Sequence, residues 1–446
     1  MIIQMGAMFK KYFIYSLILF IFTGCSPNGS NISPKKVIQF VMPGSDSTYV
    51  EMIKPLIKKF EAQNPDIDVI FQPISGQRLR SKIFVRVASE RAPDVCFIDP
   101  MDMLIFLEKD VLLELDSLIE KDRDMKKSDF FPFVIESMTW NGNLYGLTDG
   151  FTPLVIYYNK TIFDDAGLKY PDGNWDWYDF LEIAKKLTIR ADGGTIKQFG
   201  GALYDEDVLY FINAWRGSLW NKTKTKCIID TPEARAGVQF LVDLIIKHKV
   251  IPNLTDNDSQ SGDRAFKAGR VGMFLGGMWY TPNFKKDKTL KWGICEIPKG
   301  KVKVSPIFTH MWSILKQTKH PNESYRLVKF LCSPESQLYL LSFGDSVPSN
   351  IKVAQNELSK ENPDFPEDRT VYLKSLAYAV SFKKDLHHLV TWGEIDDYVW
   401  GENIEKMLLN HKAVADYTRE VQKYFNGLIK KYKNHPKVNS RSKCNT

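Results

Sequence analysis

The sequence predicts an α/β protein built of two lobes with a ligand cleft between them. Two observations carry this prediction. Strands alternate with helices over residues 37–99, and a polar break at residues 148–150 separates two core strands. Alternating strands and helices are typical of a parallel sheet with its crossover helices. A polar break between core strands marks a point where the chain leaves one lobe and enters the other.

The composition fits a soluble globular protein of this kind. The chain has 446 residues, which is enough for two domains, and it is 44% hydrophobic and 25% charged. The net charge of +7 is modest, and Lys and Arg are mixed with Asp and Glu along most of the chain. The one concentrated basic block ends the chain, and we interpret residues 431–446 as a basic disordered tail rather than a nucleic-acid-binding surface. Aromatic residues make up 13% and suit both core packing and stacking on sugar rings.

The N-terminus has the pattern of an export signal. Two lysines precede an apolar run over residues 12–22, which is too short to span a bilayer and matches the core of a signal peptide. The run ends in Phe-Thr-Gly-Cys25, which resembles the lipobox of bacterial lipoproteins, where the Cys thiol is diacylated. We therefore expect a signal peptide over 1–24, lipidation at Cys25 and a flexible tether over 25–36. A signal peptide without lipidation is the alternative.

The remaining cysteines show no metal-binding or disulfide pattern. Cys96, Cys227, Cys295, Cys332 and Cys444 are odd in number and contain no C-x-x-C pair, which argues against a zinc site, while a disulfide stays open without being demanded by the spacing. Cys96, Cys295 and Cys332 lie in apolar runs, so we expect these three to be small buried hydrophobic side chains.

The first segment reads strand–helix–strand–helix–strand. The expected strands cover residues 37–42, 67–73 and 92–98. Ligands of such sheets bind beyond the carboxyl ends of the strands, where Asp46 and Asp99 stand. Asp99 also suits an N-cap for a helix over 101–107, and the two roles are compatible.

The stretch over residues 140–160 contains a hairpin, the polar break and a buried strand. Asn141-Gly142 predicts a type I′ turn, and residues 154–158 form a continuous apolar run, typical of a strand covered on both faces. Asp149 lies in the break between them, so we expect it at the floor of the cleft.

The rest of the chain continues with helices and strands. We expect helices over 177–187, 208–219, 231–245 and 322–341, strands over 271–275, 292–297 and 309–315, and a mostly helical region over 360–428. Trp279 stands beside two glycines at a strand end, where a close approach to the backbone is possible.

Taken together, segments along the chain resemble extracellular solute-binding proteins of the maltose-binding type. The matching segments, in order, are NGNLYGLTD, TPLVIYYNKTIFDDAGL, WDWYDFLEIAKKL, FKAGRVGMFLGGMWY and HMWSILKQTKHPNESYRLVKFLCSPESQ. The resemblance covers residues 37 to about 428. It implies the substrate-binding lipoprotein of an ABC sugar transporter, with a two-lobed periplasmic-binding-protein fold and hinge crossings between the lobes. It also implies a monomer that needs no cofactor or metal and passes its sugar to ABC permease subunits.

The resemblance further implies where the lobes divide. The crossings would lie at 148–150, near 297–298 and near 348. Lobe one would hold residues 37–148 and 299–348, and lobe two 150–297 and 350–430.

Eight residues are the candidate ligand contacts. Asp46, Asp99 and Asp149 would accept hydrogen bonds from sugar hydroxyls. By match to the family, Tyr210, Trp279 and Trp392 would stack on sugar rings from lobe two. His310 and Trp312 lie where the lobe-one segment returns to the cleft, and Trp312 suits the core equally well.

Three alternatives remain open from the sequence. A secreted carbohydrate-active enzyme would need two carboxylates such as Asp99 and Asp149, but we find neither a β/α-barrel repeat nor a nucleophile motif. A metal-binding lipoprotein has only the adjacent pair His387-His388, whose rings would diverge on a helix, and Asp256-x-Asp258, which lacks the rest of an EF-hand loop. The third is a binding protein for a polyol or glycerol phosphate; a phosphate would call for an arginine near the cleft, and the candidates are Arg78, Arg80 and Arg216.

Overall fold

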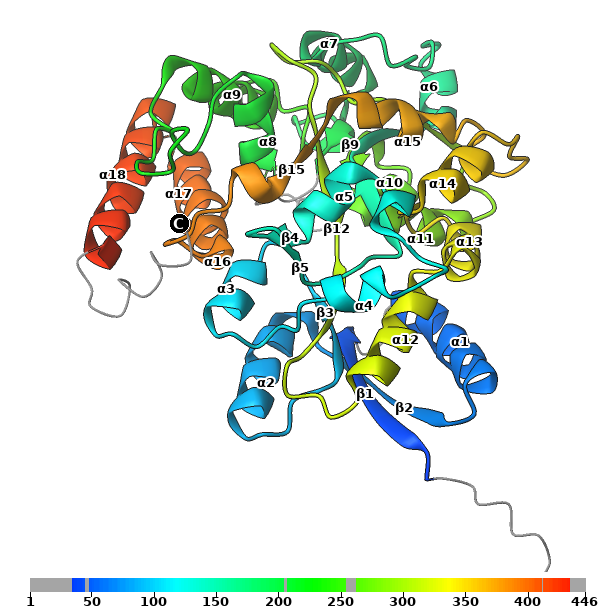
Figure 1. Ribbon diagram of the computed structural model, residues 1–446. Coiled ribbons are helices and arrows are strands. Elements are labelled where there is room, and N and C mark those ends of the chain that lie inside the picture. Colours follow the sequence, from blue (N-terminus) through cyan, green and yellow to red (C-terminus); the bar gives the residue numbers. More distant parts are fainter. Residues whose placement is uncertain (1–33, 45–47, 204–206, 254–261, 411, 434–446) are drawn as a thin grey trace, which may run out of the picture.

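The computed structural model describes residues 34–44, 48–203, 207–253, 262–410 and 412–433. Within them the chain forms three larger β-sheets: β13-β3-β1-β2, β11-β7-β10-β9-β8 and β14-β6-β12-β15. In Figure 1, β1 and β2 of the first sheet lie at the lower end of the molecule and β9 of the second lies toward the upper end. The first sheet is the centre of one lobe, which we name the first lobe, and the second sheet is the centre of the second lobe. The third sheet connects them. The predicted signal peptide, Cys25, most of the tether and Asp46 lie outside the described residues.

The first sheet has the predicted parallel β/α arrangement. Its parallel strands are β1 (Lys36–Pro43), β2 (Ile67–Ile74) and β3 (Val95–Ile98), connected through α1 (Thr48–Gln63) and α2 (Gly76–Ala88). Phe40 lies opposite Phe71 on one side and Val95 on the other, which fixes the register. The edge strand β13 (Met311–Ile314) pairs antiparallel with β3, so a segment more than 200 residues later completes this sheet.

The predicted hairpin is confirmed. Strands β4 (Thr139–Trp140) and β5 (Asn143–Leu144) pair antiparallel across a two-residue turn. Asn141 has φ of 49° and Gly142 has φ of 87°, as a type I′ turn requires.

The connecting sheet carries the passages between the lobes. It consists of β6 (Gly150–Pro153), β12 (Ser305–Thr309), β14 (Val347–Pro348) and β15 (Ala379–Ser381). β6 leads into β7 (Val155–Asn159) of the second sheet, and β12 leads through His310 into β13 of the first. The strand expected over 309–315 is therefore divided at His310 between two sheets.

The second sheet surrounds the predicted buried strand. All five residues of β7 are buried, and the strand lies between β10 (Val271–Gly276) and β11 (Trp292–Cys295). β9 (Ile196–Ala202) and β8 (Ile189–Arg190) complete the sheet. Helix α7 (Trp177–Leu187) packs on it and begins at a capping box, in which Asp176 accepts from the N–H groups of Tyr178 and Asp179.

Helices α8 (Asp207–Ala214) and α9 (Pro232–Val242) pack together beside this sheet. Helix α8 was expected to reach residue 219. It ends earlier because Arg216 adopts a left-handed φ of 68°, which an α-helix does not accommodate.

The C-terminal region is helical, as expected, with α16 (Trp392–Asp396), α17 (Glu402–Leu409) and α18 (Val414–Lys433). The predicted tail is corrected at its start, because α18 includes residues 431–433. Buried Tyr417, Val421, Phe425 and Ile429 recur every four residues, and this apolar stripe holds the helix on the second lobe. Residues 434–446, including Cys444, lie outside the described chain.

The remaining helices cover the lobes and their junctions. They are α3 (Met103–Glu108), α4 (Asp116–Glu120), α5 (Pro132–Ser137), α6 (Lys160–Asp165), α10 (Gly262–Lys267), α11 (Thr281–Lys285), α12 (Pro321–Leu331), α13 (Pro334–Phe343), α14 (Ile351–Leu358) and α15 (Thr370–Ser375). Short 3₁₀ turns occupy Lys127–Asp129, Met278–Tyr280, Leu376–Tyr378 and Phe382–Lys384, and π turns occupy Asp243–Lys247 and Asp397–Gly401.

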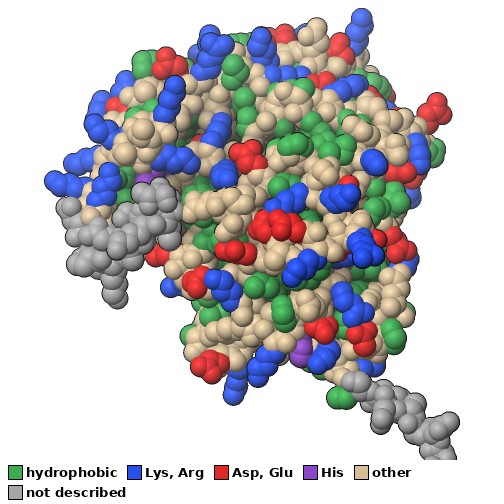
Figure 2. Space-filling model, viewed as in Figure 1, with side chains coloured by type: hydrophobic (Ala, Val, Ile, Leu, Met, Phe, Trp, Pro, Cys, Tyr) green, Lys and Arg blue, Asp and Glu red, His purple; other side chains and the backbone are tan. Residues whose placement is uncertain are grey.

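Burial and charge match the expectations for a globular protein. Cys96, Cys227, Cys295 and Cys332 are buried free thiols. On the face shown in Figure 2, Lys and Arg side chains are interspersed with Asp and Glu rather than gathered in one patch. Within the described ranges, no helix combines the length and apolar character that crossing a membrane requires.

Candidate functional site

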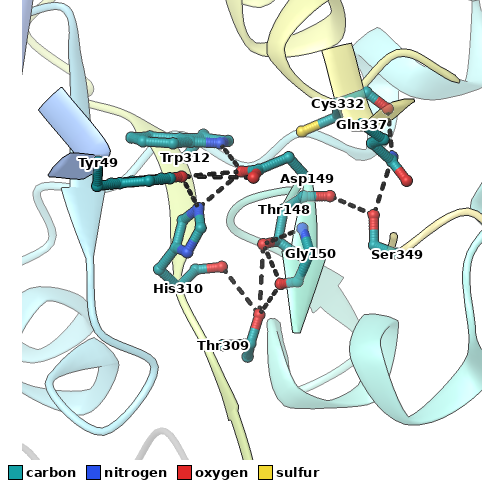
Figure 3. Close-up of polar contacts among 10 residues, drawn as sticks. All are labelled: Tyr49, Thr148, Asp149, Gly150, Thr309, His310, Trp312, Cys332, Gln337 and Ser349. Carbon is teal, nitrogen blue, oxygen red and sulfur yellow. Dashed lines mark hydrogen bonds and ion pairs between the residues drawn. The ribbon is translucent and has the colours of Figure 1, made fainter. Parts of the chain in front are cut away.

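A polar cluster surrounds Asp149 where the chain passes between the lobes (Figure 3). Asp149 is 1% exposed and directly precedes β6. Its Oδ1 accepts a hydrogen bond from Trp312 Nε1 at 2.6 Å and lies 2.7 Å from His310 Nε2. The Tyr49 hydroxyl donates to Oδ2 at 3.3 Å. A buried carboxylate needs such partners, because it has lost its hydration.

Backbone pairing explains why these side chains meet. Leu147 and Trp312 exchange backbone hydrogen bonds of 3.2 and 2.7 Å, so Asp149 follows the bridge by two residues. The Thr148 hydroxyl donates to the Gly150 carbonyl, and Ser349 Oγ donates to the Thr148 carbonyl. The polar break predicted from the sequence is therefore a buried segment with several side-chain and backbone hydrogen bonds.

Gly150 lets the crossing strands approach closely. A Cβ at this position would lie 2.2 Å from Ser346 Oγ and 2.9 Å from the Val347 carbonyl oxygen. Real Cβ atoms do not tolerate such distances, so a larger residue would push β6 away from β14.

Two further carboxyl groups lie near His310. Burial raises the pKa of Asp345 to about 7, and the negative charge of Asp149 adds to the shift while His310 opposes it. Burial also raises the pKa of Asp99 to about 6, against the hydrogen bond that its Oδ1 accepts from the Met101 N–H at 2.9 Å. Helix α3 begins only at Met103, so Asp99 caps a turn ahead of the helix and not the helix itself.

Two neighbouring cavities lie between the lobes. The smaller has a volume of about 20 Å³, and Asp99, Thr309 and Lys383 contribute to its lining. The larger has a volume of about 220 Å³ and lies between α3, the β4–β5 hairpin and the segment 386–392, which includes Trp392. Met101 and Leu386 line both, so the two cavities adjoin.

Trp279 lies beside the connecting sheet. It stands in the turn after β10, and its ring centroid is 5.1 Å from that of Phe308 in β12, in an edge-to-face arrangement. A Cβ on Gly277 would come within 2.1 Å of the Trp279 ring, so this glycine allows the indole to fold over the strand end. The half-buried Trp279 therefore reaches the strand that leads to His310.

Two of the predicted aromatic contacts are core residues. Tyr210 is 4% exposed, and its hydroxyl accepts from Trp177 Nε1 at 3.0 Å, so its ring offers no face for stacking. Trp312 is fully buried, with its ring edge-on to Phe40 at 5.3 Å. Its contribution is the hydrogen bond that orients Asp149.

The described residues bear on the metal-binding and the phosphate-binding alternatives as follows. In the described part of the chain, no group of three or more His, Cys, Asp or Glu side chains could hold a metal ion. His387 and His388 were expected to diverge on a helix; they lie in a loop, and their rings stack at 4.6 Å. Arg80 pairs with Asp102 at 2.5 Å, and no arginine lines either of the two cavities. Asp256 and Asp258 lie outside the described residues.

Comparisons with known proteins agree with this architecture. The family profile of bacterial extracellular solute-binding proteins matches residues 45–338. A binding protein of Brucella abortus is 24% identical over 330 residues, covering 71% of this chain and 76% of that protein. The lactose-binding protein of Rhizobium radiobacter is 22% identical over 348 residues, covering 72% and 77%.

A solved structure extends the similarity to most of the chain. An ABC substrate-binding protein from Listeria monocytogenes in complex with cycloalternan superposes with a TM-score of 0.78 at 25% identity, covering 88% of this chain and 98% of that one. Both lobes are included in this match, in agreement with the predicted two-lobed α/β fold. The chain belongs to the family of bacterial extracellular solute-binding proteins.

Proposed function

We propose that this protein is the substrate-binding component of an ABC importer and captures a sugar or oligosaccharide between its lobes. The observation that carries the proposal is the half-buried Trp279 ring against β12, the strand that leads to His310 and its partner Asp149. Carboxylates accept hydrogen bonds from sugar hydroxyls, and aromatic rings pack on the apolar faces of sugars. The lactose-binding relative and the cycloalternan complex support this ligand class.

Capture would occur by closure of the lobes on the ligand. The strands β6 and β12 each lead from one lobe to the other, so a rotation of the lobes about them would open or close the cleft. A ligand that touches His310 from the first lobe and Trp279 from the second binds the closed form more tightly and shifts the population toward it. The lobe boundaries would be those inferred from the sequence.

Such a protein holds its ligand and needs no bond-breaking step. The family is a class of solute-binding proteins. Incubation with oligosaccharides followed by product analysis separates this function from that of a carbohydrate-active enzyme, because binding alone returns the oligosaccharide intact.

The location and partners follow from the same function. The exported chain would be a monomer, held at the membrane through lipid on Cys25 and the tether, and would deliver its sugar to ABC permease subunits. Replacing Cys25 with Ala should then move the protein from the membrane fraction to the soluble fraction.

A thermal-shift screen against a carbohydrate panel tests the function. A ligand that binds the native state raises the melting temperature, by an amount that grows with its concentration relative to Kd. We expect at least one sugar to produce such a rise, and Trp279→Ala to abolish the largest one. If no carbohydrate raises the melting temperature, the proposed function is wrong.

A further inference from the structure

Tyr157 brings a hydroxyl group into the buried centre of the second sheet. It lies on β7, opposite Phe274 of β10 and Ile294 of β11, and is completely buried. Its ring packs edge-on against Phe284 at 5.2 Å and tilted against Trp292 at 5.6 Å between centroids. A phenylalanine ring would fill the same space. The hydroxyl group has a separate role, because its burial costs free energy unless it is hydrogen-bonded.

This hydroxyl contacts both ends of the turn that carries Trp279. It donates to the Gly277 carbonyl oxygen at 2.8 Å and lies 3.1 Å from Thr281 Oγ1. A hydroxyl group donates one proton and can also accept, so the Thr281 hydroxyl is the donor of the second bond. Gly277 precedes the 3₁₀ turn Met278–Tyr280 and Thr281 follows it, so Trp279 lies between the two contacts. One side chain of β7 therefore holds the turn at its start and at its end.

The backbone of the turn gives Trp279 limited support of its own. A 3₁₀ turn has few hydrogen bonds, and their geometry is poor. Here the Tyr280 N–H bonds to the Gly277 carbonyl oxygen at 3.3 Å. The turn also follows two successive glycines, whose backbone has more freedom than that of any other residue. The hydrogen bond from Tyr157 reaches the same carbonyl oxygen over a shorter distance, and it opposes rotation at these glycines.

Rotation at the glycines would displace the Trp279 ring. The ring lies over Gly277, where a Cβ would come within 2.1 Å of it, and its centroid is 5.1 Å from that of Phe308 in β12. The indole is half-buried, so part of its surface is exposed. A side chain that is already held in one orientation loses less conformational entropy when a ligand packs on it. Holding the turn therefore increases the affinity for a ligand that packs on this ring.

We propose that Tyr157 is a positioning residue for sugar capture: its hydroxyl holds the turn over residues 277–281 and keeps the Trp279 ring in the orientation that receives a sugar. Because Tyr157 is completely buried, it acts through Trp279 and not by touching the sugar. This role rests on the proposed function and adds to it a residue outside the set of ligand contacts.

Calorimetric titration of a double-mutant cycle tests this role. The proteins are wild type, Tyr157→Phe, Trp279→Ala and the double variant, and the titrants are lactose, maltotriose, mannotriose and the other sugars of the thermal-shift panel. We expect Tyr157→Phe to weaken the tightest complex at least about fivefold. In the Trp279→Ala background the same change should alter the affinity less than about twofold, because the ring through which the hydroxyl acts is gone. A purely structural role would weaken binding by the same factor in both backgrounds.

Fluorine NMR of protein labelled with fluorotryptophan reports the position of the ring without any sugar. The Trp279 resonance is the one that disappears in Trp279→Phe. Tyr157→Phe should shift or broaden this resonance, and Tyr158→Phe should leave it unchanged. Tyr158 is the matched control, because it is the next residue of β7 and packs on the opposite face, against Phe163. Thr281→Val removes the other hydroxyl contact and should also move the resonance, so it replaces Tyr157→Phe if that variant does not fold.

The outcomes separate this role from the function on which it rests. If Tyr157→Phe binds the sugars as tightly as wild type, or loses the same factor in both backgrounds, Tyr157 is not a positioning residue and the proposed function stands. An unchanged Trp279 resonance in Tyr157→Phe would also overturn the role. If no sugar binds to wild type, both the role and the proposed function are wrong.

Discussion

The indole N–H of Trp312 donates to the carboxylate of Asp149 at 2.6 Å, and both side chains are almost completely buried. The two residues are 163 positions apart in the chain. Their hydrogen bond joins an edge strand of the first sheet to the start of the strand that leads into the second. This hydrogen bond therefore anchors the passage between the lobes to the first sheet.

Gly150→Ala should destabilise the protein, because the new Cβ would overlap Ser346 Oγ and the Val347 carbonyl. Overpacking of this kind costs about 1–3 kcal/mol. Gly427→Ala is the control: a Cβ there meets nothing within 4 Å, and in α18 the change should stabilise by about 0.5–1 kcal/mol. Chemical denaturation measures both free energies. Equal stability of the two variants would mean that the crossing strands are not tightly packed.

Tyr210→Phe should lower the stability without changing sugar affinity. The change leaves the buried Trp177 indole N–H without its hydroxyl partner, which costs about 1–3 kcal/mol. Tyr178→Phe, on a residue 60% exposed, should have no measurable effect. An unchanged denaturation midpoint together with weaker sugar binding in Tyr210→Phe would show instead that Tyr210 contacts the ligand.

Asp345 should make the stability fall as the pH rises from about 4 to about 7. Its pKa is raised to about 7, so between these values the folded chain binds more protons than the unfolded chain, and the slope of the unfolding free energy is negative. The contribution is complete below the ordinary carboxyl pKa and is lost above about 7, with a slope of up to about 1.4 kcal/mol per pH unit.

Asp345→Asn removes this dependence. Relative to wild type, the variant should become progressively more stable as the pH rises through this window. Asp192→Asn, which makes the same change at an exposed position, is the matched control. Denaturation series at several pH values measure the difference, and a constant difference between Asp345→Asn and wild type would show that Asp345 does not titrate there.

Lys224→Met should loosen residues 383–391, which include most of the second-lobe lining of the larger cavity. Without the ammonium, the carbonyls of Lys383 and Leu386 lose their donor. Hydrogen–deuterium exchange over residues 383–391 should then become at least tenfold faster, while α7 and β7 stay unchanged. Lys222→Met on the exposed part of the same loop should leave the exchange as in wild type. Unchanged exchange in Lys224→Met would mean that residues 383–391 are held in place by their other contacts.

Local patterns made much of the fold predictable. The β/α alternation, the Asn141-Gly142 turn, the continuous apolar strand β7 and the capping box of α7 depend on residues close together in the sequence. Each of these patterns has one dominant physical cause, such as backbone φ or apolar periodicity.

The site was predictable only in part. Asp149 could be predicted because it is a carboxylate between two core strands. Its partner Tyr49 lies 100 residues away and gives no local signal. Asp345 follows a helix-ending glycine and reads as an ordinary loop residue. Tyr210 was expected to stack on a sugar by match to the family, but it lies on a helix that is apolar on nearly all sides, a pattern typical of a buried helix. The larger cavity joins three distant segments, which no short-range pattern reveals.

Calorimetric titration of wild type, Asp149→Asn and Trp279→Ala with the sugar that stabilises the chain most tests the central claim directly. The claim is that one sugar is held jointly by the passage between the lobes and by the second lobe. We predict at least a tenfold loss of affinity in each variant, about 1.4 kcal/mol or more. Tight binding that survives both substitutions would contradict it.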